Sequence, residues 1–576
     1  MNLKKINLIY RKSKFFDVMR ELNKCGEKII YNSFFYKTLF HKSNGEKFFA
    51  TGFIYQILNY ILGIIMLIGN FFSDKNFFHD SFLKKTLDSI FSFNLNSIIL
   101  KSISFKFLSD FFGLEYKKIN MDKNSNRIKI IFWSLILIIF FLLTNFIGVK
   151  KSFLITGGII FALLTFYKTK FGIFALAFFI PLLPTKFILA IILLTSFSFV
   201  FNLFFDNEQI KKLKFELIDL FVILFATLIL YTTFISYLPL LSLKSALVYI
   251  LFIAFYFVLK HTIKNRNDLF AIVSLFILSS SFVALIGVSQ KYLGVNLNIN
   301  AWIDEEMFAD NKIRVFSTLD NPNVLGEYLL FAIPICLGSI YYFKNKLCKL
   351  FAGLNLILLF FCMLLTLSRG AWLGLIFALV LFILLRDKKF LGLIFLLAFL
   401  SPIFIPKSFV QRFMSIGNMT DTSTSYRVGI WRGAFKIIKD FWPIGIGLGT
   451  DNFVYVYQKY ALSASYALHS HNFYLQLLID FGIMGVFLVF AIIFLFYKKL
   501  LVENKFLHDD FMKTFKISLC SGFFGYLIQS LTDNTWYNYR IVFLFWFMIG
   551  VASIAFDLSK LNTWGRFKFL QHKHLN

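Results

Sequence analysis

The chain has 576 residues, of which 58% are hydrophobic and 20% aromatic, and its mean hydropathy is +0.71. Repeated apolar runs of about 17 to 25 residues are long enough to cross a ~30 Å hydrocarbon core, which excludes a water-soluble globular protein. The formal net charge of +29 lies mostly in short connections between these runs, so membrane topology explains it better than nucleic-acid binding does. The composition therefore predicts an all-α, polytopic membrane protein.

The N-terminal region, residues 1–127, is predicted to be basic and cytoplasmic or interfacial. Its first 47 residues lack the apolar core of a cleavable signal peptide. Residues 52–72 are long enough to cross a bilayer or to lie flat in its interface, and the sequence does not decide between the two. The stretch that follows, up to Met121, has the Phe, Leu, Ser and Lys pattern of amphipathic helices resting on membrane lipid.

Apolar runs then follow one another through residues 128–406, interrupted by a polar loop at 293–323, and resume in residues 472–576 before a basic tail. Together they predict about fourteen transmembrane helices, within a range of 12–15. The run at 171–183 is shorter than a full crossing and is bounded by Pro181 and Pro184. The expected spans are 130–147, 152–167, 171–183, 186–205, 217–237, 244–260, 268–292, 324–343, 349–367, 371–386, 390–406, 472–497, 514–532 and 540–557.

The distribution of Lys and Arg predicts the orientation of these spans. Basic residues gather in the connections near Lys260, Lys344, Arg386 and Lys498, whereas the alternate connections carry very few. The positive-inside rule makes the first set cytoplasmic. The loop at 293–323 and a long loop at 407–471 then face outward, and only the pair Lys150 and Lys151 falls on the wrong side.

Two arginines stand out in the outward-facing connections. Arg369 is the only charge in a tight turn between two apolar helices, so it must meet water, an acid or an anionic ligand; the alternative is that it reaches the lipid headgroups. Arg314 ends an acidic loop, and its alternative is a salt bridge to one of the acids at 304–310.

The long loop is rich in Arg, Lys and aromatic residues, and a helix is predicted from the caps at 422–425 to just before Pro443. Helical spacing separates Arg427 and Trp431 from the basic stripe that begins at Arg432. Arg427, near the helix N-terminus, suits a phosphate group, whereas Lys436 and Lys439 suit attraction to anionic lipid. The glycines at 445–449 lack a following GK[ST], so they predict a close backbone turn at the membrane edge.

His469 and His471 lie where the chain re-enters the membrane. They form an H-x-H pair, but no third ligand with suitable spacing is evident, so neither a metal nor any other cofactor is expected. One interpretation is an exposed, helix-capping pair. The other is a general base beside arginines, because a neutral imidazole accepts a hydroxyl proton near pH 7. The five cysteines show no metal-type spacing and are interpreted as packing residues.

Four motifs now stand in order: RVFSTLDNPNVLGEYLLFAIP, LSRGAWLGL, SYRVGIWRGAFKIIKDFWPIGIGLG and HSHNFYLQLLIDFGIMG. Their order and spacing over residues 314–485 resemble the O-antigen ligase and O-antigen polymerase family of integral membrane proteins. Residues 1–127 fall outside the resemblance. One departure is Asp480, where the family often has Glu.

The resemblance implies a metal-independent, glycosyltransferase-C-like enzyme on the outer face of the bacterial cytoplasmic membrane. The donor would be an oligosaccharide on undecaprenyl diphosphate, and the acceptor a sugar hydroxyl of a glycan or a lipid-linked repeat, with inversion at the anomeric carbon. It implies catalytic roles for Arg314, Arg369 and His471. Substrate-binding roles are predicted for Arg427, Arg432, Asn321, Asn323, His469 and Asn472.

Two other readings compete with the enzyme. A flippase or transporter of lipid-linked oligosaccharides, or of another anion, also fits about fourteen spans, but it should place its charges near the bilayer midplane and in repeats. A membrane scaffold with a polar cap would leave the clustering of Arg314, Arg369 and His471 unexplained. Ligase and polymerase differ only in the acceptor, and the sequence leaves that choice open.

Overall fold

The computed structural model describes residues 103–112, 148–205, 213–294, 314–390, 422–461, 467–502 and 509–573, together with isolated positions before 148. Every regular element in these ranges is a helix, which confirms the predicted all-α class. The helices are α8 (Ile103–Phe112), α10 (Val149–Tyr167), α11 (Lys170–Phe179), α12 (Thr185–Phe205), α14 (Leu217–Phe234), α15 (Pro239–Thr262), α16 (Arg266–Leu293), α17 (Pro322–Tyr342), α18 (Lys346–Leu365), α19 (Arg369–Arg386), η1 (Lys388–Phe390), α22 (Thr422–Phe441), α23 (Thr450–Tyr460), α24 (Phe473–Val502), α25 (Asp510–Gln529) and α26 (Tyr539–Lys573).

Ten helices of the described part are long and apolar enough to cross a membrane, namely α10, α12, α14 to α19, α24 and α26. The chain is therefore a multi-pass membrane protein, although the predicted number of about fourteen is not confirmed. The short run at 171–183 forms α11, a helix of 10 residues. The predicted spans at 130–147 and 390–406, and the stretch 52–72 that the sequence left undecided, fall largely outside the described residues.

Small residues let α17, α19 and α25 approach one another closely. A Cβ placed on Gly374 of α19 would lie 2.5 Å from the carbonyl oxygen of Gly525 in α25, and one placed on Gly326 of α17 would lie 2.5 Å from Cβ of Ala371. Close backbone approach through small residues is how membrane helices gain packing energy without a hydrophobic driving force between them. These three helices position the turns at which the polar residues described below are found.

The basic connections gather at one end of the bundle, where they are held by ion pairs. Arg266, at the start of α16, bonds the carboxylate of Asp509, just before α25, at 2.6 Å. Lys260, near the end of α15, bonds Asp219 at 2.6 Å and Glu216 at 2.9 Å, and Lys499 of α24 also bonds Glu216. The nearly cation-free turns meet at the opposite end, so the two sets of connections segregate as the sequence predicts.

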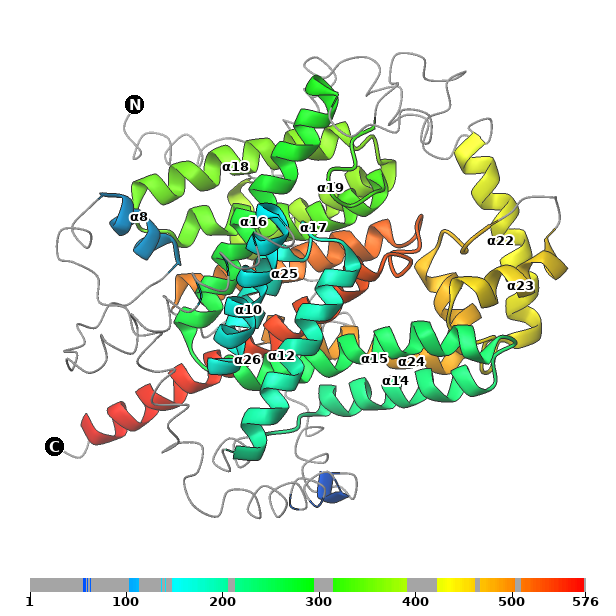
Figure 1. Cartoon of the computed structure of the whole chain (residues 1–576), viewed down its shortest axis with the longest axis horizontal. Coiled ribbons are helices and arrows are strands. Elements are labelled where there is room, and N and C mark those ends of the chain that lie inside the picture. Colours follow the sequence, from blue (N-terminus) through cyan, green and yellow to red (C-terminus); the bar gives the residue numbers. More distant parts are fainter. Residues whose placement is uncertain are drawn as a thin grey trace, which may run out of the picture.

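The helices α22 and α23 cover that opposite end, away from α8 and the C-terminus (Figure 1). They form a small apolar core of their own, which also takes in the first half of α24; its buried members include Ile430, Ile437, Phe453, Val456 and Ile479. This cap is fixed to the bundle through the polypeptide backbone.

The fixing point is a break in α24 at Gly482, whose φ of 63° and ψ of −165° are not helical. The amide of Ile483 donates to the carbonyl of Trp442 at 2.8 Å, and the amide of Ile446 donates to the carbonyl of Ile479 at 2.7 Å. In an unbroken helix the amide of Ile483 would donate to the carbonyl of Ile479. At the break, both groups form hydrogen bonds to the cap instead. Gly445, Gly447 and Gly449 have positive φ here, which confirms the predicted close backbone turn.

We expect the substitution Gly482→Ala to destabilise the cap. Its φ and ψ lie in a region that is almost exclusive to glycine, where another residue costs about 1–3 kcal/mol, and the new Cβ would lie 2.5 Å from the backbone of Pro443 and Ile444. Thermal unfolding should show a lower midpoint. Gly353→Ala in α18 is the matched control, because a Cβ there meets nothing within 4 Å; an equal effect of both changes would contradict the backbone account.

Candidate functional site

Four separate segments converge at the end of the bundle that α22 and α23 cover. They are the segment 314–323, the turn 366–369, the segment 467–472 and the turn 530–538. The amide of Val315 donates to the carbonyl of Leu365 at 3.2 Å, and the amide of Phe473 donates to the carbonyls of Ser530 and Asp533, each at 3.0 Å. Backbone bonds therefore hold together loops that are far apart in the sequence.

A chain of side-chain hydrogen bonds runs across these loops. The Arg314 guanidinium donates through Nη2 to Oδ1 of Asn323 at 2.9 Å. The side-chain nitrogen Nδ2 of Asn323 donates to Oδ2 of Asp533 at 2.8 Å, and Nδ1 of His471 lies 3.3 Å from Oδ1 of the same carboxylate. The structure thus brings the predicted residues Arg314, Asn323 and His471 into one network, with Asp533 as the link.

Arg314 is also bound to the protein backbone, since its Nε donates to the carbonyl of Thr366 at 3.0 Å. Asn321 caps α17 and accepts the backbone amide of Asn323 at 2.8 Å, which fixes the backbone at Asn323. The guanidinium is therefore held rigidly between two loops. The acids at 304–310, its predicted alternative partners, lie outside the described residues.

Asp533 sets the tautomer of His471. Burial raises the pKa of the Asp533 carboxyl, but the hydrogen bond from His471 and the charge of Arg427 lower it more, so its net pKa lies well below the usual range. The group is a carboxylate near pH 7, and a carboxylate only accepts hydrogen bonds. Nδ1 of His471 must then carry the proton of this hydrogen bond, and in the neutral ring Nε2 is left as an acceptor.

His469 lies behind His471 and is 7% exposed. Its ring centroid is 4.1 Å from that of His471 and 4.3 Å from that of Tyr537. Its Nδ1 accepts the backbone amide of His471 at 3.1 Å, so the neutral ring carries its proton on Nε2. The interpretation of an exposed histidine pair is therefore wrong for His469, because the turn at 530–538 covers it.

The buried His469 should make stability depend on pH. Burial, and to a smaller extent His471 and Arg427, lower its pKa to about 3, against about 6.5 in an unfolded chain. Between those values the unfolded state binds a proton that the folded state does not, so the free energy of unfolding falls as pH falls, by up to ~1.4 kcal/mol per pH unit. We expect His469→Gln to make this slope shallower in unfolding measured between pH 7 and 4.5.

Asp533 contributes little in that window. Its depressed pKa adds stability that is present above an unfolded value of about 3.9 and is lost only as pH falls below it. An unchanged slope in the His469→Gln variant would show that this histidine is not buried in its neutral form.

The helix α22 brings Arg427 to the histidines. Trp431 donates its indole N–H to the carbonyl of Ser470 at 3.0 Å, and the Tyr426 ring centroid lies 6.1 Å from that of His471. Arg427 is half-buried and close enough to influence the charge of both His469 and Asp533. Arg432 is exposed on another face of α22, together with Lys436 and Lys439, as helical spacing predicts.

Arg369 and Asn472 border the turn at 530–538. Arg369 is half-buried at the first position of α19, and a Cβ on the next residue, Gly370, would lie 2.4 Å from the hydroxyl of Thr532, the neighbour of Asp533. Asn472 donates to the carbonyl of Leu531 at 2.8 Å and accepts the amide of Leu475 at 3.0 Å. Asn472 therefore caps α24 and ties it to the turn.

Backbone strain marks the same place. Among the described residues, the four non-glycine residues with positive φ are Ser317 at 53°, Asp320 at 62°, Leu367 at 52° and His471 at 48°. All lie in the converging loops, within a few residues of Arg314, Arg369 or at His471 itself. Such conformations persist only where surrounding contacts enforce them, and they concentrate at functional sites.

The three groups His469, His471 and Asp533 could also hold a metal ion, because one ligand atom from each lies within 4.8 Å of the others. The sequence showed no third ligand, and Asp533 is that ligand in space. Two features oppose a divalent cation here: the positive charge of Arg427 nearby and the use of Nδ1 of His469 to accept a backbone amide. The donor set fits a hydrogen-bonded network better than it fits a metal.

The sequence interpretation missed Asp533 as a site residue. The sequence did contain an indication, because Asp533 is the acid in a turn that has almost no basic residues and that is predicted to face outward. Only the fold shows that this acid meets Asn323, 210 residues earlier in the chain.

Fold and site together define a multi-pass membrane protein with an arginine- and histidine-bearing polar site at one end of its helix bundle. Residues 354–490 match the model of the O-antigen ligase family (Wzy_C), the family that the motifs resemble. The match includes Arg369, Arg427 and His471, and it supports glycan transfer in general terms. A search of curated proteins gave no match.

Proposed function

We propose that the protein transfers or polymerises oligosaccharide from an undecaprenyl-diphosphate donor onto a sugar hydroxyl, without a metal and with inversion at the anomeric carbon. The observation that carries the proposal is the network of Arg314, Asn323, Asp533 and His471, with Arg427 beside it. It combines fixed cations, which suit a diphosphate, with an imidazole that is oriented as a base.

His471 acts as the general base in this mechanism. Asp533 holds the proton on Nδ1, so Nε2 takes the proton of the acceptor hydroxyl as the hydroxyl oxygen attacks the anomeric carbon. Asp533 then stabilises the imidazolium that forms. A positioned base of this kind typically contributes 10²–10⁴-fold in rate.

The arginines act on the leaving group. As the bond from the anomeric carbon to the diphosphate breaks, negative charge grows on the phosphate oxygens, and guanidinium groups bind such oxygens in pairs. Arg369 and Arg427 are the side chains that we assign to this role. Arg314 donates to Thr366 and Asn323, so we assign it first to positioning and second to charge.

The site faces outward in this proposal. The basic connections lie at the opposite end of the bundle, where ion pairs such as Arg266–Asp509 hold them, and the positive-inside rule makes that end cytoplasmic. The enzyme would then act on the extracytoplasmic face of the bacterial cell membrane, with residues 407–471 forming an external loop. The acceptor is a glycan or a second lipid-linked repeat.

The test is to incubate the purified full-length protein in lipid nanodiscs with a synthetic undecaprenyl-diphosphate-linked repeat unit, in the presence of a chelator. We expect longer glycans and released undecaprenyl diphosphate. No glycan growth with several repeat units and acceptors would overturn the proposal. Movement of the labelled lipid across vesicle membranes without glycan growth would support the flippase instead.

A further inference from the structure

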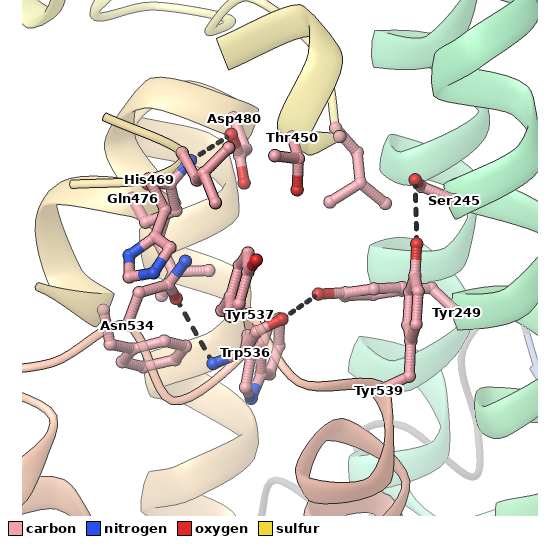
Figure 2. A pocket seen from close by; sticks show the side chains of 15 residues that line it. Ser245, Tyr249, Thr450, His469, Gln476, Asp480, Asn534, Trp536, Tyr537 and Tyr539 are labelled. Atoms are coloured by element: carbon pink, nitrogen blue, oxygen red, sulfur yellow. Dashed lines mark hydrogen bonds between the residues drawn. The ribbon is translucent and has the colours of Figure 1, made fainter. Parts of the chain in front are cut away.

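A cavity that His469 helps to line lies between α15, α23, α24 and the turn from α25 to α26 (Figure 2). Its free volume is about 40 Å³. A water-sized group needs roughly 10–15 Å³ measured in this way, so the cavity takes about three such groups. That is the room needed for a few hydroxyls along one edge of a sugar ring.

The chemistry of the lining differs from that of the arginine network. None of the fifteen residues that line the cavity is Lys or Arg, and Asp480 is its only carboxylate. The Asp480 carboxyl group is buried and accepts the side-chain amide of Gln476 at 2.8 Å through Oδ1. No cation in the lining would offset the charge of a phosphate group, so the cavity does not suit the charged part of the donor.

The lining instead offers paired hydrogen-bond donors and acceptors beside an aromatic ring. The Asp480 carboxyl group accepts, the neutral His469 ring donates from Nε2, and the hydroxyl of Thr450 does either. Tyr537, whose ring packs against that of His469 at 4.3 Å between centroids, supplies an aromatic side chain in the wall. This combination of carboxylate, amide, hydroxyl and aromatic groups suits vicinal hydroxyls on an uncharged ring with an apolar face.

We propose that this cavity binds the hydroxyl edge of one uncharged sugar ring of the glycan substrates. The inference rests on the proposed function and adds to it a subsite that recognises the sugar. This subsite is separate from the arginines that bind the diphosphate. His469 joins the two, because its ring lines the cavity and also packs against that of His471 at 4.1 Å between centroids. The sugar belongs either to the acceptor or to the donor glycan.

The direct test uses cysteine labelling without turnover. Thr450→Cys is made in the full chain carrying Cys25→Ser, since the four described native cysteines are buried, and its labelling by a small maleimide is timed. The probes are millimolar methyl glycosides of glucose, galactose, mannose and N-acetylglucosamine, with inorganic diphosphate for comparison. We expect at least one glycoside to slow labelling several-fold and diphosphate to have no effect. Ser245→Cys, on α15, repeats the test if the first variant folds poorly.

Two comparisons between probes show whether the bound sugar belongs to the donor or to the acceptor. Protection by the lipid-linked repeat unit, but not by free glycosides, would assign the cavity to the donor sugar; protection by free glycosides would assign it to the acceptor. No protection by any glycoside or by the lipid-linked repeat would overturn the subsite. If the protein transfers glycan but no probe protects the cysteine, the proposed subsite is wrong and the proposed function stands. If a probe protects the cysteine but no glycan is transferred, the subsite stands and the proposed function is wrong.

A kinetic test addresses individual groups. Thr450→Val removes a hydroxyl, and Asp480→Asn replaces one acceptor oxygen by an NH2 group that only donates. A lost hydrogen bond of this kind corresponds to about a three- to tenfold rise in KM for the sugar substrate. The matched control is Thr227→Val on the exposed face of α14, whose hydroxyl bonds the carbonyl of Ile223 at 3.0 Å within its own helix. Equal KM values for all three variants and the wild type would contradict the proposal.

Discussion

Replacing Asp533 by Asn is expected to lower the rate of glycan transfer by about two to four orders of magnitude. In the wild-type protein the Asp533 carboxylate accepts hydrogen bonds from both Asn323 and His471. The amide of an asparagine has only one oxygen to accept them. Either the link to Asn323 breaks, or the amide donates to Nδ1 of His471 and moves the imidazole proton to Nε2. In the second case the base faces its substrate with a proton already in place.

The control for this prediction is Asp440→Asn on α22, an exposed acid that bonds the Tyr460 hydroxyl at 2.8 Å; its rate should stay near that of the wild type. Binding of sugar-free undecaprenyl diphosphate separates catalysis from folding, because a folded Asp533→Asn variant should still bind it. Turnover near the wild-type rate in that variant would exclude the pairing of Asp533 with His471 from the mechanism.

The helices could be predicted from the sequence because the length of an apolar run is a local property. The run predicted at 217–237 forms α14 at Leu217–Phe234, and that at 324–343 forms α17 at Pro322–Tyr342. The break in α24 at Gly482 was not predicted, because it depends on backbone bonds from Ile446 and to Trp442. Those partners come from a different segment, and no local composition specifies them.

The site was predictable to the extent that it depends on period and topology. Helical spacing separated Arg427 from Arg432, and the pattern of basic connections grouped Arg314, Arg369 and His471 at one end. The role of Asp533 and the burial of His469 depend on how the turn at 530–538 packs against the segment 467–472. Because that packing joins loops about 60 residues apart, only the fold reveals it.

The second large effect is expected from Arg369→Lys, which keeps the positive charge but loses the planar pair of donors. A lysine binds a phosphate as a point charge, whereas arginine binds two of its oxygens at once. Loss of one such donor to a developing negative charge costs on the order of 3 kcal/mol at the transition state, or about a hundredfold in kcat. Release of undecaprenyl diphosphate from the lipid-linked repeat measures this rate directly.

The matched control is Arg432→Lys, the same exchange at an exposed position of α22, which should leave the rate unchanged. The hundredfold loss should appear in kcat more than in the KM for the donor, since the charge that Arg369 meets grows only as the bond to the diphosphate breaks. If Arg369→Lys turned over like the wild type, Arg369 would supply only bulk positive charge, and the paired recognition of phosphate oxygens would have to come from Arg427.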